Sequence, residues 1–301
     1  MTETYIRYAR TPTLNICYEE SGNVDSCPVI LMHGFPDDVR TWDGVVPALV
    51  SNGYRVIVPY LRGYGKTLFL NSNTLRSGQQ AALGNDLLEL MNCLKIDKSI
   101  LVGYDWGGRA ACIVSALWSE RVIGLISIGG YNIQNIPLAQ EPANPEQEYR
   151  YWYQWYFNTE RGRAGLKKNR RKFCKLLWQL WSPNWHFKDD EYERTAISFD
   201  NPDFVEVVIH SYRHRYGIVP GDPLLEDIEN KLLKQPLISV PTVDLEPACD
   251  GVEAPDEPPN DSHMFSGSYN RRVIPVAGHF LPRESASAVI QAVLDLKKLV
   301  I

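Results

Sequence analysis

The sequence predicts an α/β fold, in which an open, mostly parallel sheet carries helices on both faces and a helical segment is inserted into it. Three runs, 28–34, 54–60 and 99–105, are continuously apolar and end at turns, which is typical of strands buried in a parallel sheet. Helix-like stretches alternate with these runs, and this alternation places helices on both faces. The strand pattern stops after residue 130 and resumes after residue 236.

The elements before the insertion are predicted in chain order. Two strand-like runs at 5–9 and 14–19 indicate an antiparallel start to the sheet. A helix is predicted over 77–94, because apolar residues recur there at helical spacing. A second helix is predicted at 109–117, directly after the third apolar run, and a fourth buried strand at 122–128.

The insertion divides the chain into an α/β core of two parts, 1–130 and 237–301, and a helical domain at 131–236 that is rich in Trp, Tyr and charge. Within the insertion, helices are predicted near 145–157, 160–183 and 202–216. After it, strands are predicted at 237–246 and 272–277 and a final helix at 284–298.

Composition narrows the class of protein. The chain has 301 residues, 44% of them hydrophobic and 22% charged, and 31 basic against 36 acidic residues give a net charge of −5. An acidic balance argues against nucleic-acid binding. There is no apolar signal core near the start, no apolar run of about 20 residues and no C-x-x-C pair among the six cysteines. We expect a cytoplasmic protein with reduced thiols and no membrane or nucleic-acid partner; homo-oligomer formation stays open.

One motif indicates a nucleophile. The segment Gly103-Tyr-Asp-Trp-Gly107 follows a buried strand and opens a helix. Glycines at the flanking positions permit a sharp turn that presents the central side chain, here Asp105 where such turns usually carry Ser. A carboxylate can act as a covalent nucleophile, and it attacks saturated carbon to form an alkyl ester. The residue type therefore predicts an epoxide or an alkyl halide as the substrate.

Two other strand ends supply complementary groups. The last predicted strand is followed by His279, which can deprotonate the water that hydrolyses the ester. The first buried strand is followed by a loop in which the backbone N–H of Phe35 can pair with that of Trp106 as an oxyanion hole.

The histidine needs an orienting acid between the nucleophile and itself in chain order. Asp250 lies 29 residues before His279, in the loop after the strand predicted at 237–246, and is the preferred candidate. The sequence leaves Asp244, Glu246 and Asp256 as alternatives.

Several segments carry a family resemblance: HGFPDDVRTW at 33–42, GYRVIVP at 53–59, LRGYG at 61–65 and GYDWGG at 103–108. They are similar to the epoxide hydrolases of the α/β-hydrolase fold, which are related to haloalkane dehalogenases. The resemblance extends from about residue 5 to residue 298 and is weakest in the middle of the insertion. Two positions depart from the family pattern: Tyr60 replaces an Asp, and Ser211 replaces a Trp.

The resemblance implies that residues 131–236 form a cap domain whose two tyrosines hydrogen-bond the epoxide oxygen. Tyr153 and Tyr212 occupy the matching positions, and Tyr156 is the nearest alternative to Tyr153. A phenol is protonated at pH 7 and can still donate a proton to an alkoxide. Weaker candidates for the substrate pocket are His33, Pro36, Trp155 and Tyr156.

These observations favour an epoxide hydrolase that needs no metal or cofactor and whose partner is a small apolar epoxide. A haloalkane or haloacid dehalogenase is the first alternative, since it would use the same Asp nucleophile; the two cap tyrosines favour the epoxide. A non-catalytic receptor built on the same fold is the second alternative, because a fold alone does not establish an activity.

Overall fold

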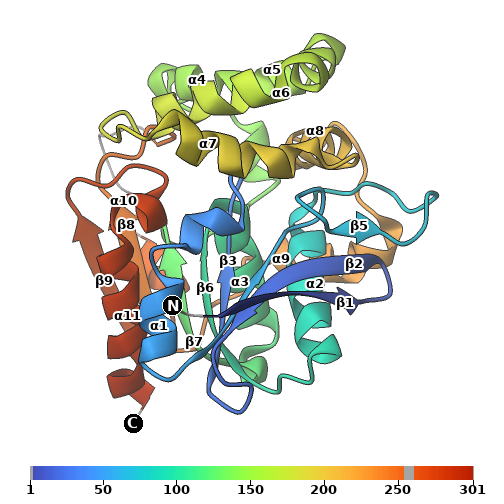
Figure 1. The fold of residues 1–301 in the computed structure, drawn as a ribbon. Helices are drawn as coiled ribbons and strands as arrows, with labels where there is room; N and C mark the ends of the chain where they lie inside the picture. The colour runs from blue at the N-terminus through green and yellow to red at the C-terminus, as the bar shows by residue number, and fades with distance from the viewer. Residues whose placement is uncertain (1–2, 254–260, 301) are drawn as a thin grey trace.

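The computed structural model describes residues 3–253 and 261–300, and in this part of the chain nine strands form one sheet beneath a layer of helices (Figure 1). The strands are β1 (Thr4–Arg10), β2 (Leu14–Ser21), β3 (Pro28–Met32), β4 (Arg55–Pro59), β5 (Leu68–Phe69), β6 (Ser99–Tyr104), β7 (Val122–Ile128), β8 (Thr242–Pro247) and β9 (Tyr269–Ile274). Their order is β1-β2-β4-β3-β6-β7-β8-β9, with β5 paired to β2. The pairs from β4 to β9 are parallel, and those involving β1, β2 and β5 are antiparallel.

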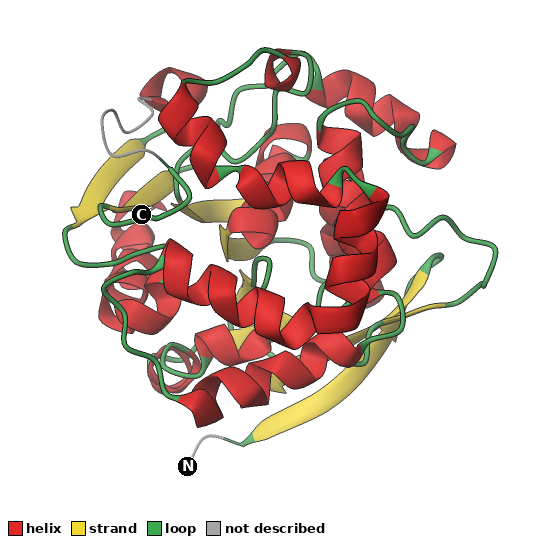
Figure 2. Cartoon of the chain, turned by 90° about the horizontal axis from the view of Figure 1, so that it is seen from above, coloured by secondary structure: helices red, strands yellow, loops and turns green. Residues whose placement is uncertain are grey.

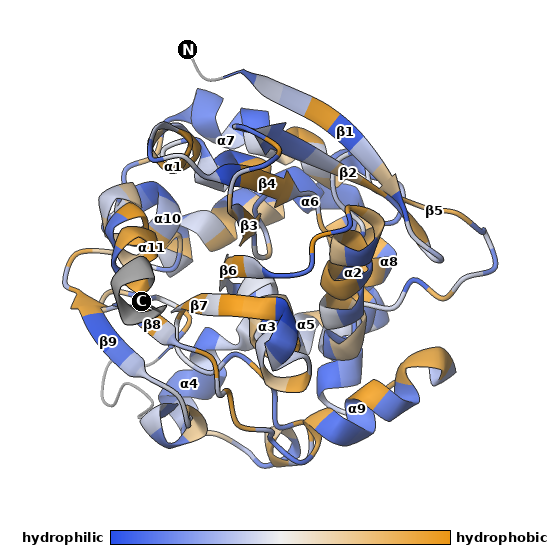
Figure 3. Ribbon diagram, turned by 90° about the horizontal axis from the view of Figure 1, so that it is seen from below, coloured by the Kyte–Doolittle hydropathy of each residue, from blue (hydrophilic) through white to orange (hydrophobic). Residues whose placement is uncertain are grey.

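Helices cover both faces of the sheet. The helices of the α/β core are α1 (Val46–Ser51), α2 (Gln80–Cys93), α3 (Asp105–Leu117), α10 (Leu281–Glu284) and α11 (Ala286–Val300). Seen from below, α1 and α11 lie on one side of the line of strands, and α2 and α3 lie on the other (Figure 3). The central strands are consequently buried on both faces, and every residue of β6 is buried. This layering confirms the predicted α/β fold.

The helices of the insertion lie mostly over the carboxyl ends of the strands (Figures 1 and 2). They are α4 (Pro145–Arg150), α5 (Trp152–Phe157), α6 (Glu160–Trp181), α7 (Asp189–Ala196), α8 (Phe204–Arg215) and α9 (Glu226–Leu232). The last of these, α9, packs against α2 of the core rather than over the strand ends. Among the described residues, no helix combines the length and the apolar character that a bilayer-spanning helix requires.

The observed elements differ from the predicted ones mainly at their boundaries. The helix predicted from 109 begins at Asp105, because the turn after β6 leads directly into it. The strand predicted over 237–246 begins only at Thr242, since Pro241 has no N–H to donate to a neighbouring strand. The helix predicted over 145–157 is divided at Tyr151.

The two helices α7 and α9 lie where no helix is predicted. Each is short and has three acidic residues in its first turn, which stabilise a helix N-terminus. So short a segment contains too few apolar residues to show the helical spacing from which a helix is predicted.

A buried ion cluster ties the helices of the insertion to the α/β core. Arg283 of α10 binds the carboxylate of Asp37 through two nitrogen atoms, and the Tyr104 hydroxyl donates to the same carboxylate at 2.6 Å. The neighbouring Asp38 accepts a hydrogen bond of 2.6 Å from Ser198, which lies directly after α7. Because the side chains of this cluster are buried, that of Arg283 being 4% exposed, the cluster fixes the loop after β3 against both layers.

Candidate active site

Asp105 occupies a strained turn between β6 and α3. Its φ angle of 49° lies in the left-handed region, which a side chain other than glycine rarely adopts. The flanking glycines permit the close packing that this turn needs: a Cβ on Gly107 would lie 2.2 Å from the carbonyl oxygen of Met32, and one on Gly103 would lie 2.4 Å from that of Gly107. The glycine pattern of the sequence therefore has a steric cause, and strain of this kind is typical of functional positions.

The parallel pairing brings the loops of the site together. β3 and β6 are in register from Val29 and Ile100 to Met32 and Gly103, so the two strands end side by side. The loop after β3 consequently lies against the nucleophile turn, and the Phe35 N–H donates to Oδ1 of Asp105 at 2.7 Å.

His279 lies between two carboxylates. Its Nδ1 is 2.9 Å from Oδ2 of Asp250, and its Nε2 is 3.9 Å from Oδ2 of Asp105. Nε2 has no hydrogen-bond partner among the described residues, although the atom is buried. The side chains of Asp105 and His279 keep 15% and 10% of their surface exposed. A water held between Nε2 and Asp105 would therefore be within reach of a base.

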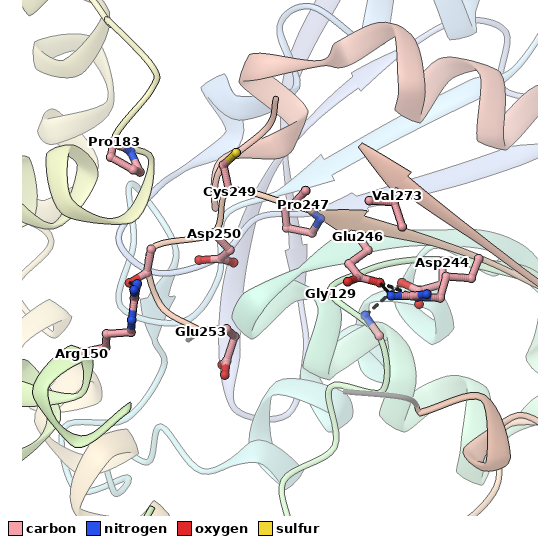
Figure 4. Close-up of a pocket in the computed structure, with 14 residues that line it drawn as sticks. Gly129, Arg150, Pro183, Asp244, Glu246, Pro247, Cys249, Asp250, Glu253 and Val273 are labelled. Carbon is pink, nitrogen blue, oxygen red and sulfur yellow. Dashed lines mark hydrogen bonds and ion pairs between the residues drawn. The ribbon is translucent and has the colours of Figure 1, made fainter. Parts of the chain in front are cut away.

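The structure distinguishes the candidate acids. Asp244 accepts bonds from the Gly130 N–H at 3.0 Å and from the Tyr269 hydroxyl at 2.7 Å, and Glu246 pairs with Arg271. Both carboxylates therefore bind partners other than His279. Figure 4 shows that they lie apart from Asp250. Asp256 lies outside the described residues. Only Asp250, among the described candidates, contacts the imidazole.

A cavity of about 460 Å³ is lined in part by Asp250 (Figure 4). It is lined by residues of the β8 end and the following loop, together with Arg150 and Pro183, and neither Asp105 nor His279 is among its lining residues. We therefore do not identify this cavity with the space in front of the nucleophile.

The protonation of His279 depends on its two carboxylate neighbours. Burial by itself lowers the pKa of this imidazole, but the charge and hydrogen bond of Asp250, followed by the charges of Asp105 and Glu253, outweigh burial and raise the pKa to about 9. In the resting site the imidazole is therefore protonated at neutral pH. Removing the negative charge of Asp105 would lower this pKa.

The two predicted cap tyrosines lie close together over the site. Tyr153 of α5 and Tyr212 of α8 are both buried, and their ring centroids are 5.4 Å apart. Burial raises the pKa of both phenols well above 10, so both keep their proton. The Tyr153 oxygen accepts a bond of 3.0 Å from Gln154 Nε2, which leaves its own proton for another acceptor.

The remaining predicted residues differ in placement. Trp106 stacks on Phe35 with centroids 5.5 Å apart, but its backbone N–H makes no hydrogen bond to Asp105 in the described part of the chain. Its role as the second oxyanion donor stays a prediction. Trp155 is 39% exposed and packs on Tyr216 at the cap surface, and the Tyr156 ring stacks on that of Phe173.

The two pocket candidates in the loop after β3 are held by the protein itself. His33 is fully buried; its Nδ1 lies 3.0 Å from the Gly34 carbonyl and its Nε2 accepts from the Leu61 N–H at 3.1 Å. Burial lowers the pKa of His33 to about 4, so it is neutral at pH 7. The Pro36 carbonyl accepts from Trp178 of α6 at 2.7 Å. These contacts indicate that both residues position the loop.

Sequence reasoning missed three polar residues near the site: Arg109, Gln154 and Arg215. Arg109 lies four residues after Asp105, so helical spacing alone places it on the same face of α3 and could have identified it. Gln154 and Arg215 lie about 60 residues apart and meet only through the packing of α5 on α8, for which the sequence offers no local signal. No group of three or more potential metal ligands occurs in the described ranges.

Comparison with known proteins is consistent with this geometry. Residues 28–244 match the family described as the alpha/beta hydrolase fold. A crystal structure of a provisionally named epoxide hydrolase from Klebsiella pneumoniae shares 43% sequence identity and superimposes with a TM-score of 0.95, covering 98% of this chain and 97% of the other. The chain therefore belongs to the α/β-hydrolase fold family, and within that family it groups with the epoxide hydrolases.

More distant relatives extend the same likeness. Epoxide hydrolase A of Mycobacterium tuberculosis is 25% identical over 308 residues, covering 92% of both chains. The crystal structure of epoxide hydrolase A from Mycobacterium thermoresistibile, 20% identical, shares the fold with a TM-score of 0.75 over 98% of each chain.

Proposed function

We propose that this chain hydrolyses epoxides to vicinal diols through a covalent ester on Asp105. The observation that carries this proposal is the placement of His279, whose two ring nitrogens face Asp250 and Asp105 beneath two protonated cap phenols. A carboxylate, a base for water and a proton donor for oxygen are the three groups that this reaction requires. The similarity to proteins named epoxide hydrolases supports the same assignment.

In the first step, an oxygen of Asp105 attacks a ring carbon and the carbon–oxygen bond of the epoxide breaks. The departing oxygen takes a proton from Tyr153 or Tyr212, so the product is a hydroxyalkyl ester and a phenolate. In this assignment, residues 131–236 act as the cap that supplies these two phenols. Because Arg215 lies over the Tyr212 ring and opposes the rise in its pKa, it favours the transient phenolate.

In the second step, His279 removes a proton from water and the resulting hydroxide attacks the ester carbonyl of Asp105. The carbonyl oxygen becomes negative and is stabilised by the Phe35 N–H, which already contacts Oδ1 in the resting site. The ester bond then breaks, the diol leaves with the second proton of the water, and His279 keeps the proton that it took, so the ionised Asp105 and the protonated imidazole of the resting site are regenerated. The sum is epoxide plus water to diol.

The charge of Asp105 couples the two steps. While Asp105 is ionised, His279 holds its proton, because its pKa of about 9 lies above neutral pH. Ester formation neutralises Asp105 and so withdraws one of the interactions that raise this pKa. After the ester has formed, the resting proton of His279 passes to the phenolate, and the neutral imidazole then acts as the base.

The test is to trap the ester in His279→Gln. Incubated with an aryl epoxide such as styrene oxide, this variant is expected to gain the mass of one epoxide on the peptide that contains Asp105, whereas Asp105→Asn gains none. In ¹⁸O water, a single turnover of the wild type should place the label on Asp105 and leave the first diol unlabelled. Diol formation without any adduct or label would overturn the covalent route, and halide release from haloalkanes without diol formation would favour the dehalogenase.

A further inference from the structure

Arg109 is a buried cation that lacks a dedicated acidic partner. It lies one helical turn after Asp105 on α3, it is 7% exposed, and its Nε donates to the carbonyl of Asn132 at 3.2 Å. Among the described residues, no carboxylate lies within ion-pair distance of its guanidinium. Burial and the nearby charge of Arg215 lower the pKa of Arg109 to about 10. Buried arginines are almost always paired, so this cation is unusual.

Arg215 approaches the same region from the cap, at the end of α8. Its NH1 donates to Oε1 of Gln154 at 2.9 Å, and its other nitrogens face the amide oxygen of Gln134. Its guanidinium lies 4.9 Å from the centre of the Tyr212 ring. These polar partners are neutral, and no ion pair of Arg215 occurs within the described ranges. The cap therefore adds a second guanidinium that forms no ion pair among the described residues.

Both guanidinium groups lie within electrostatic reach of Asp105, Tyr153 and Tyr212. The Asp105 carboxylate offsets part of their charge in the resting site. When the ester forms, this negative charge passes to the phenolate, so the buried Arg109 and the half-buried Arg215 share a single negative charge in both states. Buried charge without a full counter-charge is costly, so an anion carried by the substrate would stabilise the site.

We propose that Arg109 and Arg215 together form an anion-binding subsite beside the nucleophile, and that the preferred substrates are epoxides with a carboxylate near the ring. The planar guanidinium fork matches a carboxylate, and two forks from different layers can orient one. The inference rests on the proposed function, since it assigns a substrate class to the same site.

The test compares two epoxides with one carbon skeleton, 3-phenylglycidate and 3-phenylglycidol. The measured quantity is the ratio of kcat/KM for the acid to kcat/KM for the alcohol. We expect the wild type to prefer the acid, and Arg109→Met or Arg215→Met to lower the ratio by roughly tenfold to a hundredfold, the range of a charged hydrogen bond. Arg215→Lys should retain part of the preference.

The control is Arg213→Met on the same helix. The guanidinium of Arg213 pairs with Glu160 outside the site, so this variant should leave the ratio unchanged.

A second measurement needs no variant and covers the case in which the substitutions prevent folding. Cinnamate and cinnamyl alcohol have the same carbon skeleton without the epoxide. Cinnamate should inhibit the hydrolysis of 3-phenylglycidol by the wild type at least tenfold more strongly than cinnamyl alcohol does. Equal ratios in all variants, or equal inhibition by the two compounds, would overturn the subsite while diol formation still supported the proposed function. If neither epoxide gives a diol or an adduct, the proposed function itself fails.

Discussion

At the scale of single residues, the site depends on how Asp250 and Asp105 share the charge of His279. Asp250 contacts Nδ1 directly, and Asp105 lies 3.9 Å from Nε2. The pKa of about 9 is the outcome of these two attractions against burial, which acts in the opposite direction. The pKa of the base in the proposed reaction is therefore determined by the neighbouring carboxylates and not by the imidazole alone.

Replacing Asp250 by Asn should lower the pKa of His279 from about 9, because the largest interaction that raises it is removed while burial still lowers it. Titration of the His279 ring by NMR would measure this directly. Asp105→Asn should produce a smaller decrease, since the charge of Asp105 is the lesser contribution. A pKa that stays near 9 in Asp250→Asn would contradict the assignment of the acid.

The same pKa predicts how stability changes with pH. A folded pKa raised from 6.5 to about 9 favours the folded state fully below pH 6.5, and this contribution is lost as pH rises through 9. Relative to His279→Gln, the wild type should lose on the order of 3 kcal/mol of unfolding free energy between pH 6 and pH 10. Urea denaturation of both proteins at several pH values would measure the difference, and parallel curves would contradict it.

The two phenols should share the donation of the proton. Tyr153→Phe or Tyr212→Phe should each lower kcat by about tenfold to a hundredfold, because the other hydroxyl remains and the two ring centroids lie only 5.4 Å apart. The double variant should lose activity almost completely. Steady-state kinetics on one epoxide would test this, and total loss in either single variant would contradict shared donation.

At the scale of elements, the turn between β6 and α3 requires glycine at 107 because the neighbouring strand end leaves no room for a Cβ. Gly107→Ala would place that carbon 2.2 Å from the backbone oxygen of Met32, so β3 or α3 must shift. We expect a loss of about 1–3 kcal/mol in unfolding free energy and a large loss of activity.

The matched control for this prediction is Gly44→Ala, whose added carbon meets only the Cβ of Ala286 at 3.1 Å. Gly44 lies outside the turn, so the Gly44→Ala variant should keep the activity of the wild type. Thermal unfolding and kinetics on the two variants would separate the effects; a fully active Gly107→Ala would show that the turn tolerates a wider spacing than the strand register implies.

At the scale of the whole molecule, the cap is held to the core through the charges around Arg283. Its guanidinium neutralises Asp37 in a buried setting, while burial and the charge of Asp37 raise the pKa of Asp38 to about 7. The cluster is thus short of positive charge even with Arg283 present. Loss of this one side chain would leave the loop after β3 with uncompensated charge.

Arg283→Met should therefore lower the free energy of unfolding by about 3–5 kcal/mol, the usual cost of breaking a buried pair. Adding Asp37→Asn should recover part of this loss, because the stranded charge is removed. Arg271→Met, which breaks the half-exposed pair with Glu246, should cost no more than about 1 kcal/mol. Denaturant unfolding of the wild type and these three variants would measure the differences, and equal losses for Arg283→Met and Arg271→Met would contradict the prediction.

The local sequence predicted the features that depend on near neighbours in the chain. Apolar runs identified the central strands, and glycine spacing identified the turn that carries Asp105, because strand burial and turn geometry are set by a few consecutive residues. Tyr153 and Tyr212 came from a family resemblance, and the structure brings their rings together.

Only the tertiary structure decided the relations between distant segments. It showed that Asp250, rather than Asp244 or Glu246, contacts His279, because the latter two are engaged by other partners across the sheet. It also brought Arg215 of the cap toward Arg109 of the core, an approach that depends on how α8 packs over the strand ends. Residue type and spacing determine which chemistry the chain can perform, whereas the packing of its layers determines which charges meet, because charge pairing depends on distance in space and not along the chain.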